Sequence, residues 1–519
     1  NDGTGGGTTA GSTAGSTAGP GTTGGTTGEP IFGTTGGGTG APSRPCEGLE
    51  CQQVSCEGGG TTSLSGTVLD PSGTVPLYNA IVYVPNAPVD PFPQGNVTCD
   101  RCGTVPSGKP IATALTDAAG KFTLKNVPVG NDIPVVIQIG RWRRQIRVPG
   151  VPRCTDTPLA AAETRLPRTK AEGDIPRIAV TTGGADSLEC FFRKLLGESV
   201  EEITNPSGPG RVHLYQGLRR PNEYKQRCNR WSGNPQTADN CTRWVDDNDC
   251  GGSQICRTVY PVADGVKIDN DTPPATSLWG SAGGTAQAGK PHTVSWPAAT
   301  SKLMNYDMVV LSCEGSENLI TKEPAAREAL GAYLDAGGRV FASHYHYTWI
   351  KNSATLGGLA NWGSEGIEGD ATVRVDTSFP RGSDFADWLV NVNASPPADG
   401  GRSFVKMIQL RDHVNSLNAG ARQWIYDTTA TDGTGTPQTP KYFSFNTPIT
   451  AGADAQCGRG VYTDIHVSSG DGSTGLFPAN CTSSGLTAQE KALLFLLMDL
   501  SACVQDDTRP PAPPPPIIR

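Results

Sequence analysis

The chain has 519 residues, 18% of them charged, and a formal net charge of −8. This length is enough for two or three domains with cores of their own, and the absence of a stripe of Lys and Arg argues against nucleic-acid binding. No apolar run approaches the ~18 residues that a membrane-spanning helix needs, so no transmembrane segment is expected.

Residues 1–45 are dominated by Gly, Thr and Ser and include the repeat TAGSTAGSTAG (Thr9–Gly19). Such a composition cannot bury enough apolar surface to offset the entropy lost on ordering, so it predicts a flexible tether. Tails of this kind commonly follow the lipidated cysteine of bacterial lipoproteins, and a lipid anchor upstream of residue 1 is one interpretation.

Fifteen cysteines follow the tail, several in close pairs. This usage is typical of an oxidising compartment and predicts a disulfide framework. It indicates an extracellular protein or one at a bacterial outer-membrane surface. A short Cys-rich segment spans residues 46–60. The predicted disulfide cysteines are Cys46, Cys51, Cys56, Cys99, Cys102, Cys154, Cys228, Cys241, Cys250, Cys256, Cys457 and Cys481.

Residues 61–168 alternate between short β-strand patterns and turns rich in Gly, Pro and Asp. This spacing predicts an antiparallel β-sandwich. The segments SGTVLD and TDAAGKFTLKNVPVG resemble the carboxypeptidase regulatory-like, transthyretin-like domain over about residues 64–165. Asp117 is expected to cap a turn, Gly120 to take a positive φ and Phe122 to enter the core. The resemblance implies a stalk or binding platform. The arginine-rich RWRRQIRVP (Arg141–Pro149) is expected to be an exposed strand with a charged edge.

Strand and helix patterns alternate across residues 173–503, as in IPRIAVTTGG followed by SLECFFRKLLG. This predicts an α/β doubly wound, mostly parallel sheet. An insertion at about 205–300 contains four cysteines, expected to form two local disulfides, and an acidic run that offers calcium ligands at Asp246, Asp247 and Asp249. The termini are expected to be disordered, and the Pro-rich residues 504–519 to form an extended, solvated tail.

The segments YDMVVLSCEG, ALGAYLDAGGRVFASHYHY and GRGVYTDIHVS resemble the class I glutamine amidotransferase-like fold, and within it the ThuA-like branch. The whole chain is similar to a family of uncharacterised myxobacterial surface proteins that combine these two domains. In amidotransferases a nucleophilic cysteine occupies the bend after a central strand. Here His344 stands in that region, so hydrolysis of glutamine by a thiolate is not expected.

Two predicted strand ends carry imidazoles: His344 and His346 after one strand, and His466 with Asp464 after another. These four residues are the candidate acid/base or catalytic group. Two histidines that are two positions apart on an extended chain share a face. His344, His346 and His466 are therefore also candidate ligands for a divalent metal.

Four other residues offer similar chemistry. Cys313 stands beside Glu314 at a strand end and is either a nucleophile or, as an oxidising compartment favours, a buried thiol or disulfide member. His413 is expected to be a satisfied polar residue, and His213 and His292 have no local pattern.

These features favour an exported, cell-surface-tethered binding or structural protein with a degenerate amidotransferase-like domain. Its partner would be a glycan or an envelope protein, and self-assembly at the surface is not excluded. The alternative is a secreted metal- or His-dependent hydrolase acting on carbohydrate or envelope substrates. A divalent metal is the one cofactor that the histidine pattern suggests.

Overall fold

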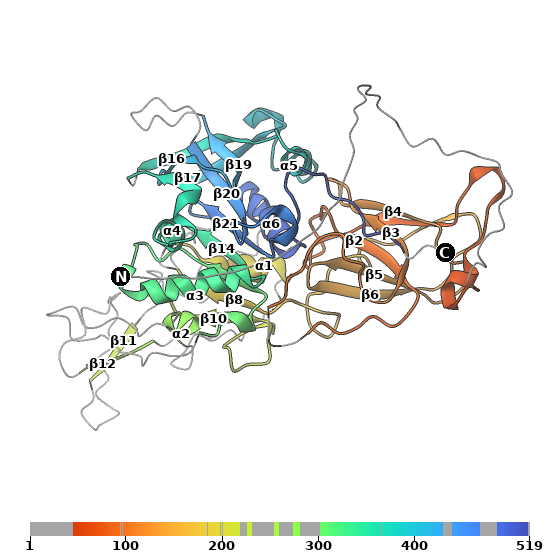
Figure 1. Ribbon diagram of the computed structural model, residues 1–519, viewed down its shortest axis with the longest axis horizontal. Coiled ribbons are helices and arrows are strands. Elements are labelled where there is room, and N and C mark those ends of the chain that lie inside the picture. Colours follow the sequence, from red (N-terminus) through yellow and green to blue (C-terminus); the bar gives the residue numbers. More distant parts are fainter. Residues whose placement is uncertain are drawn as a thin grey trace, which may run out of the picture. The chain divides into compact units, whose positions relative to one another are not determined.

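Figure 1 shows the computed structural model of the chain. It describes residues 45–516 except 94, 96, 184, 198, 200, 218–225, 231–253, 259–272, 274, 281–300, 365, 429–438 and 468–484. Nearly all of the predicted tether lies outside the described residues. So do the three calcium candidates (Asp246, Asp247, Asp249), Cys241, Cys250, Cys481 and His292.

Two sheets form the first part of the described chain; all their strand pairs are antiparallel except β1 with β7, which is parallel. One has the strand order β4-β1-β7 and the other β3-β2-β5-β6. Their inward-facing side chains, among them Leu64, Val82 and Ile137, are fully buried in a shared apolar core. The strands are β1 (Ser63–Thr67), β2 (Ile81–Pro85), β3 (Pro110–Leu115), β4 (Lys121–Lys125), β5 (Ile133–Ile139), β6 (Trp142–Val148) and β7 (Asp156–Pro158).

The turn between β3 and β4 confirms the conformation expected from the sequence. The Asp117 carboxylate accepts hydrogen bonds from the backbone N–H groups of Ala119 and Lys121, at 2.8 and 2.9 Å. Gly120 has φ 72°, and a Cβ there would lie 2.7 Å from the Cβ of Pro76. Phe122 is 4% exposed in the core. Only glycine satisfies both the backbone conformation and the close approach.

A ten-stranded sheet dominates the second half, with the order β17-β16-β19-β20-β21-β14-β13-β8-β10-β9. The six strands from β21 to β9 are parallel, whereas β20, β19, β16 and β17 extend the sheet by antiparallel pairing. The sheet is therefore mixed. Its strands are β8 (Ile178–Thr181), β9 (Ile203–Thr204), β10 (Val212–Tyr215), β13 (Met308–Leu311), β14 (Arg339–Ser343), β16 (Ile367–Val375), β17 (Phe404–Arg411), β19 (Ala421–Asp427), β20 (Thr439–Thr447) and β21 (Gly458–Thr463).

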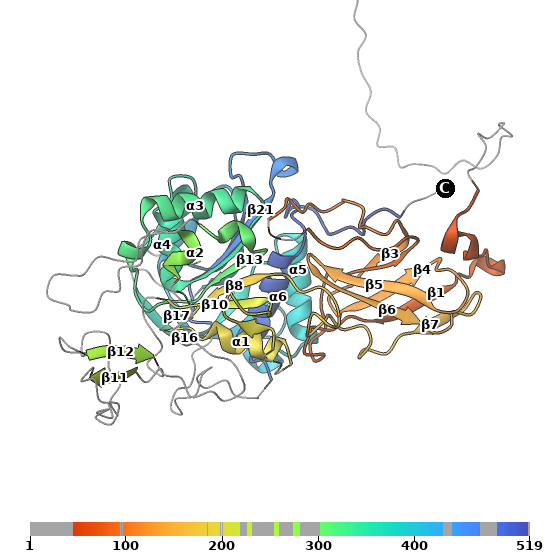
Figure 2. The same ribbon diagram turned by 90° about the horizontal axis from the view of Figure 1, so that it is seen from below.

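Helices cover both faces of the parallel strands because successive side chains of a strand point to opposite faces. Val180 and Val310 belong to the apolar core that includes side chains of α1, α5 and α6. Ala179 and Val309 belong to a second core with α2, α3 and α4. Figure 2 shows α3 and α1 on opposite sides of the sheet. The helices are α1 (Leu188–Leu195), α2 (Thr276–Trp279), α3 (Pro324–Asp335), α4 (Tyr347–Lys351), α5 (Pro380–Asn391) and α6 (Ala488–Ser501).

Two further pairs of strands lie outside these sheets. β15 (Ala360–Trp362) pairs with β18 (Val414–Leu417). Within the predicted insertion, β11 (Gln226–Arg230) pairs with β12 (Gln254–Thr258), and this antiparallel register sets Cys228 opposite Cys256. No helix among the described residues is both long and apolar enough to cross a membrane.

Disulfides confirm the general prediction and correct its details. Cys190 is disulfide-bonded and Cys503 bonds to Cys102, although neither was among the predicted cysteines. The closely spaced Cys99 and Cys102 do not pair with each other, because each bonds to a residue far along the chain. The described pairs are Cys46–Cys51, Cys56–Cys154, Cys99–Cys457 and Cys102–Cys503.

The loop between β2 and β3 covers the amino ends of the central strands of the ten-stranded sheet. Cys99 and Cys102 in this loop bond to residues beside β21 and α6. Arg339 at the start of β14 donates to the backbone oxygen of Asp100. A Cβ on Gly337 would lie 2.4 Å from the Thr98 oxygen, so the loop and the sheet are in close contact.

Two sequence-based expectations about exposure are wrong. Trp142 is 1% exposed, and Arg143 is 7% exposed, paired with Asp174 at 2.8 Å. This part of β6 is therefore a packed contact and not an exposed charged edge. The segment after residue 503 is packed as well: Asp507 pairs with buried arginines, and the Pro514 oxygen accepts a hydrogen bond from Thr113.

Candidate functional site

The carboxyl ends of β8, β13, β14 and β21 are neighbours in the sheet, so the residues that follow these strands lie close together. Ligands of open α/β sheets bind beyond this edge. Cys313 follows β13, His344 follows β14 directly, and Asp464 and His466 follow β21. Asp186 lies in the loop between β8 and α1. The parallel strands thus bring together side chains that are up to 280 positions apart in the sequence.

His344 occupies the sharp bend between β14 and α4. Its φ is +39°, a left-handed conformation that costs a non-glycine residue on the order of 1 kcal/mol. Its backbone oxygen accepts a hydrogen bond from the Tyr462 hydroxyl at 3.0 Å, which fixes the bend to β21. The side chain at this position is therefore directed across the ends of the neighbouring strands.

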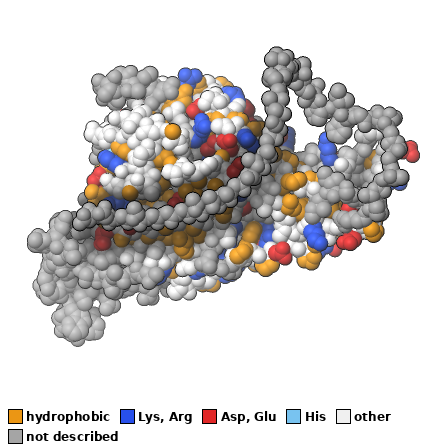
Figure 3. Space-filling model, in the orientation of Figure 1, with side chains coloured by type: hydrophobic (Ala, Val, Ile, Leu, Met, Phe, Trp, Pro, Cys, Tyr) orange, Lys and Arg blue, Asp and Glu red, His pale blue; other side chains and the backbone are white. Residues whose placement is uncertain are grey.

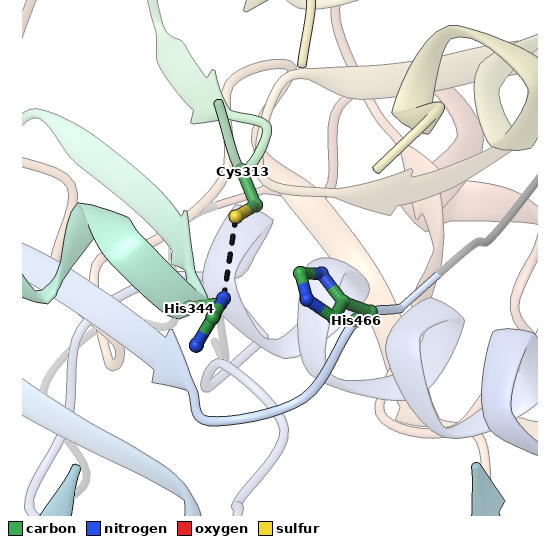
Figure 4. A group of neighbouring side chains, drawn as sticks. All are labelled: Cys313, His344 and His466. Carbon is green, nitrogen blue, oxygen red and sulfur yellow. Dashed lines mark hydrogen bonds between the residues drawn. The ribbon is translucent and has the colours of Figure 1, made fainter. Parts of the chain in front are cut away.

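Cys313, His344 and His466 converge in a buried group, shown in Figure 4. The Cys313 Sγ lies 3.4 Å from His344 Nδ1, and the ring centroids of His344 and His466 are 4.5 Å apart. The three residues are 0%, 1% and 5% exposed. Solvent and large substrates therefore have no direct access to the thiol.

Asp186, in the loop after β8, contacts this group. Its Oδ1 lies 3.4 Å from His466 Nδ1, and its Oδ2 accepts a hydrogen bond from the Ser343 hydroxyl. The same hydroxyl accepts from the backbone N–H of Cys313 at 2.8 Å. Asp186 was not singled out in the sequence, because it precedes a helix and matches no motif.

Asp464 faces His413 and is fully satisfied by four hydrogen bonds. The donors are the Tyr462 hydroxyl, the His413 ring, and the backbone N–H groups of His413 and Val414. Burial alone would raise the pKa of Asp464. The hydrogen bond and charge of His413, with the nearby Lys441, outweigh burial and lower the pKa to about 2. Asp464 is a structural carboxylate that holds the loop after β17.

His346 has a different role from the one the sequence suggested. Its Nε2 donates to the Ser312 oxygen at 2.7 Å, and its Nδ1 accepts from the Trp349 indole at 3.1 Å. The premise of an extended chain is wrong here, because residues 344–346 form a turn of 3₁₀-helix, in which positions two apart do not share a face. His346 is therefore a packing residue, and both of its ring nitrogens are bonded.

His413 was expected to be a satisfied polar residue, and it is bonded to Asp464, but its place beside His344 was not foreseen. Its ring lies 4.9 Å from that of His344 and 4.5 Å from that of Tyr347. It comes from the loop between β17 and β18, in the antiparallel extension of the sheet. No local pattern could have placed it beside His344, since only the topology of that extension brings the loop to this edge.

The protonation states of the buried group do not suit a thiolate nucleophile. Burial, with the nearby Asp186, raises the pKa of the Cys313 thiol. Burial lowers the pKa of His344, and the attraction of Asp464 offsets this only in part. The pair is thus a neutral thiol beside a neutral imidazole, whereas reactive cysteines need an environment that lowers the thiol pKa. Cys313 is the free cysteine of the described chain and is buried, as expected.

In the part of the chain that the structure describes, two sets of side chains are close enough to share a metal ion. They are Cys313, His344 and His466, and His344, His413 and Asp464. In each set the candidate ligand atoms lie within 4.8 Å of one another. The set that the sequence predicted, with His346 as the third member, is not one of them.

An open pocket of about 610 Å³ lies beside the buried group. His413 and Tyr345 contribute to its wall, so the pocket and the buried group share a boundary. Tyr347 stacks between His413 and Trp362, with ring centroids 4.5 and 5.7 Å away. The pocket is lined by Ser316, Glu317, Asn318, Leu319, Tyr345, Tyr347, Lys351, Gly363, Ser364 and His413.

Comparison with known proteins identifies no family. No protein-family model matches the chain, and no curated protein sequence matches it. Two solved structures show a partial likeness. Both are interface mutants of a type II cohesin–X-dockerin complex from Acetivibrio cellulolyticus. The first is 16% identical over 28% of this chain and 75% of that chain, and the second 17% over 24% and 78%. Both have a TM-score of 0.14, which is too low to bear on fold or function.

Proposed function

We propose that this is an exported binding protein, tethered to the cell surface, that holds a segment of glycan in the open pocket. In this proposal the second half is a degenerate, doubly wound amidotransferase-like domain, and the first half is a carboxypeptidase regulatory-like stalk. The observation that carries the proposal is the 610 Å³ pocket at the carboxyl edge of the sheet.

The chemistry of the pocket wall suits a polyhydroxylated ligand. Tyr345 and Tyr347 offer aromatic surface together with a polar hydroxyl, and the Tyr347 hydroxyl donates to the Glu317 carboxylate. Asn318 and Lys351 add amide and ammonium groups at the same opening. An apolar or aromatic wall with a few polar groups is the usual composition of a small-molecule site.

Two observations favour holding a glycan over cleaving it. Among the described residues that line the pocket, Glu317 is the single acidic one, whereas glycoside hydrolysis normally uses a pair of carboxylic acids on either side of the bond. The thiol and imidazoles of the buried group are sealed from solvent. These facts give less support to the alternative of a secreted metal- or His-dependent hydrolase.

The surroundings of the site support an extracellular setting. The described chain contains several disulfides, two of which link segments more than 350 positions apart, and such bonds persist in oxidising compartments. On the face drawn in Figure 3, Lys and Arg are interspersed with Asp and Glu outside the grey atoms. This pattern supports a partner that is not a polyanion.

A glycan-array screen of the full chain, followed by calorimetric titration with the best ligand, tests this function. Replacing Tyr345 with Ala removes one aromatic wall of the pocket. We expect at least a tenfold loss of affinity, about 1.4 kcal/mol. The matched control is Tyr426→Ala, since Tyr426 is a partly buried tyrosine of β19 that does not line the pocket. Failure of every glycan to bind, or equal affinity in Tyr345→Ala, would refute the proposal.

A further inference from the structure

The buried group of Cys313, His344 and His466 contains the ligand types that zinc prefers. One thiolate and two imidazoles form a soft donor set, which selects Zn²⁺ or Cu⁺ over Mg²⁺ or Ca²⁺. We propose that these three side chains bind one thiophilic transition-metal ion of the zinc type. The site is separate from the pocket, and the inference does not depend on glycan binding.

The distances match those of a shared metal ion. With a Zn–S bond of about 2.3 Å and a Zn–N bond of about 2.0–2.1 Å, tetrahedral geometry places the sulfur about 3.5 Å from the nitrogen. The observed separation of Cys313 Sγ and His344 Nδ1 is 3.4 Å. A ring nitrogen of His466 completes the triangle within 4.8 Å, and Figure 4 shows one of its nitrogens on the side that faces His344.

The residues behind the ligands have the arrangement that metal sites use. A metal-binding histidine usually directs its other ring nitrogen toward a carboxylate, which fixes the ring. His466 Nδ1 lies 3.4 Å from Asp186 Oδ1, so Nε2 is left for the ion. Ser343 in turn holds Asp186 through a hydrogen bond.

Behind the proposed ligands, His466 Nδ1 and Asp186 Oδ1 are buried and lie 3.4 Å apart, but neither makes a hydrogen bond. Leaving buried polar atoms unsatisfied is costly, and an uncompensated buried charge costs more. A divalent ion would balance the charges of the Cys313 thiolate and the Asp186 carboxylate. It would also orient the His466 ring for a hydrogen bond to Asp186.

The other possible set, His344 with His413 and Asp464, is less suitable. The Asp464 oxygens already accept four hydrogen bonds, and the His413 Nδ1 is one of the donors. A metal in that position would have to displace these bonds. Because Cys313, His344 and His466 follow β13, β14 and β21, an ion held by them would tie together the carboxyl ends of three neighbouring strands.

Cobalt substitution tests the site in the full chain. The protein is produced in cobalt-supplemented medium, so that the ion is present as the chain folds. We expect one tightly bound Co²⁺ per chain, a thiolate-to-cobalt charge-transfer absorption, and a lower thermal unfolding midpoint after prolonged chelation. A wild-type protein without this absorption, in which the Cys313 thiol is titrated after unfolding, would overturn the proposal.

Variants distinguish the two sets of ligands. Cys313→Ser keeps the side-chain volume and should abolish the charge-transfer absorption, and His466→Gln should weaken cobalt retention at least tenfold. The matched control is His413→Gln, which should keep both the absorption and the stoichiometry. Loss of cobalt in His413→Gln together with full retention in Cys313→Ser would reject the proposed ligands and favour the set around Asp464.

Discussion

The two edges of the ten-stranded sheet differ in how they handle buried polar groups. At the amino edge, the loop that contains Cys99 and Cys102 is disulfide-bonded to residues next to β21 and α6. Arg459, near the start of β21, pairs there with Asp499 and Asp507, and Arg381 of α5 pairs with the same two carboxylates. Two positive charges face two negative ones.

The opposite end of β21 leads to Asp464 and His466, and the balance of buried charges is different there. The buried imidazole of His344 and the Cys313 thiol are neutral. The open pocket lies on this side. The comparison indicates that the amino edge supplies stability and that the carboxyl edge retains groups able to bind a ligand.

The largest expected effect is at the amino edge. Arg381→Ala leaves Asp499 and Asp507 with one arginine between them, because Arg381 is 1% exposed and pairs with both. Removing one partner of a buried ion pair costs about 3–5 kcal/mol. Urea unfolding at pH 7 measures this loss of stability.

The matched control removes an exposed arginine that pairs with the same helix. Arg402 pairs with Asp387 of α5, and both side chains are nearly half exposed. Exposed pairs contribute about 0–1 kcal/mol, so Arg402→Ala should have little effect. Equal losses in the two variants would mean that the buried charge cluster is not the source of stability at this edge.

Lowering the pH is expected to have an intermediate effect on stability, through His213. Burial, with the charge of Arg177, lowers the pKa of His213 to about 4. Arg211 adds repulsion, whereas the bond to the Gly210 oxygen opposes the shift. Because the folded pKa lies below the unfolded value of about 6.5, the contribution of His213 is complete above pH 6.5 and is lost as the pH falls toward 4.

Between pH 7 and pH 5 this loss amounts to about 2 kcal/mol. The measurement compares urea unfolding of the wild type and His213→Gln at both pH values. Glutamine can still hydrogen-bond to the Tyr306 hydroxyl but does not titrate. The variant should therefore lose about 2 kcal/mol less over this interval, and identical pH dependence in the two proteins would contradict the prediction.

The smallest effect on stability is expected at the carboxyl edge. Lys351 is exposed, lines the pocket and lies with its ammonium 5.2 Å from the ring centre of Tyr347. Lys351→Ala should change the free energy of unfolding by no more than about 0.5–1 kcal/mol, while weakening the binding of the proposed glycan. A large loss of stability here would show that the two edges are not specialised as the comparison suggests.

Local chemistry made parts of the fold predictable. The turn around Asp117, Gly120 and Phe122 followed from residue types alone, because each has a distinct conformational or burial preference. The parallel strands were recognisable as short β-branched runs between helices. The antiparallel extension from β20 to β17 was not recognised as such, since strand direction depends on the connections and not on composition.

The candidate site was only partly predictable, for a similar reason. His344 and His466 were placed together correctly, because both follow parallel strands whose ends coincide. Cys313 was weighed by itself, and its proximity to His344 depends on strand order, which the sequence does not display. His346 was misplaced by assuming an extended chain where a 3₁₀ turn occurs.

The long-range disulfides impose an order of events on biosynthesis. Cys99 and Cys102 emerge some 350 and 400 residues before Cys457 and Cys503. Along the proposed route of export into an oxidising medium they encounter other thiols first. Early pairings must be exchanged once the distal cysteines arrive, so a disulfide isomerase in the receiving compartment should determine the yield of correctly bonded protein.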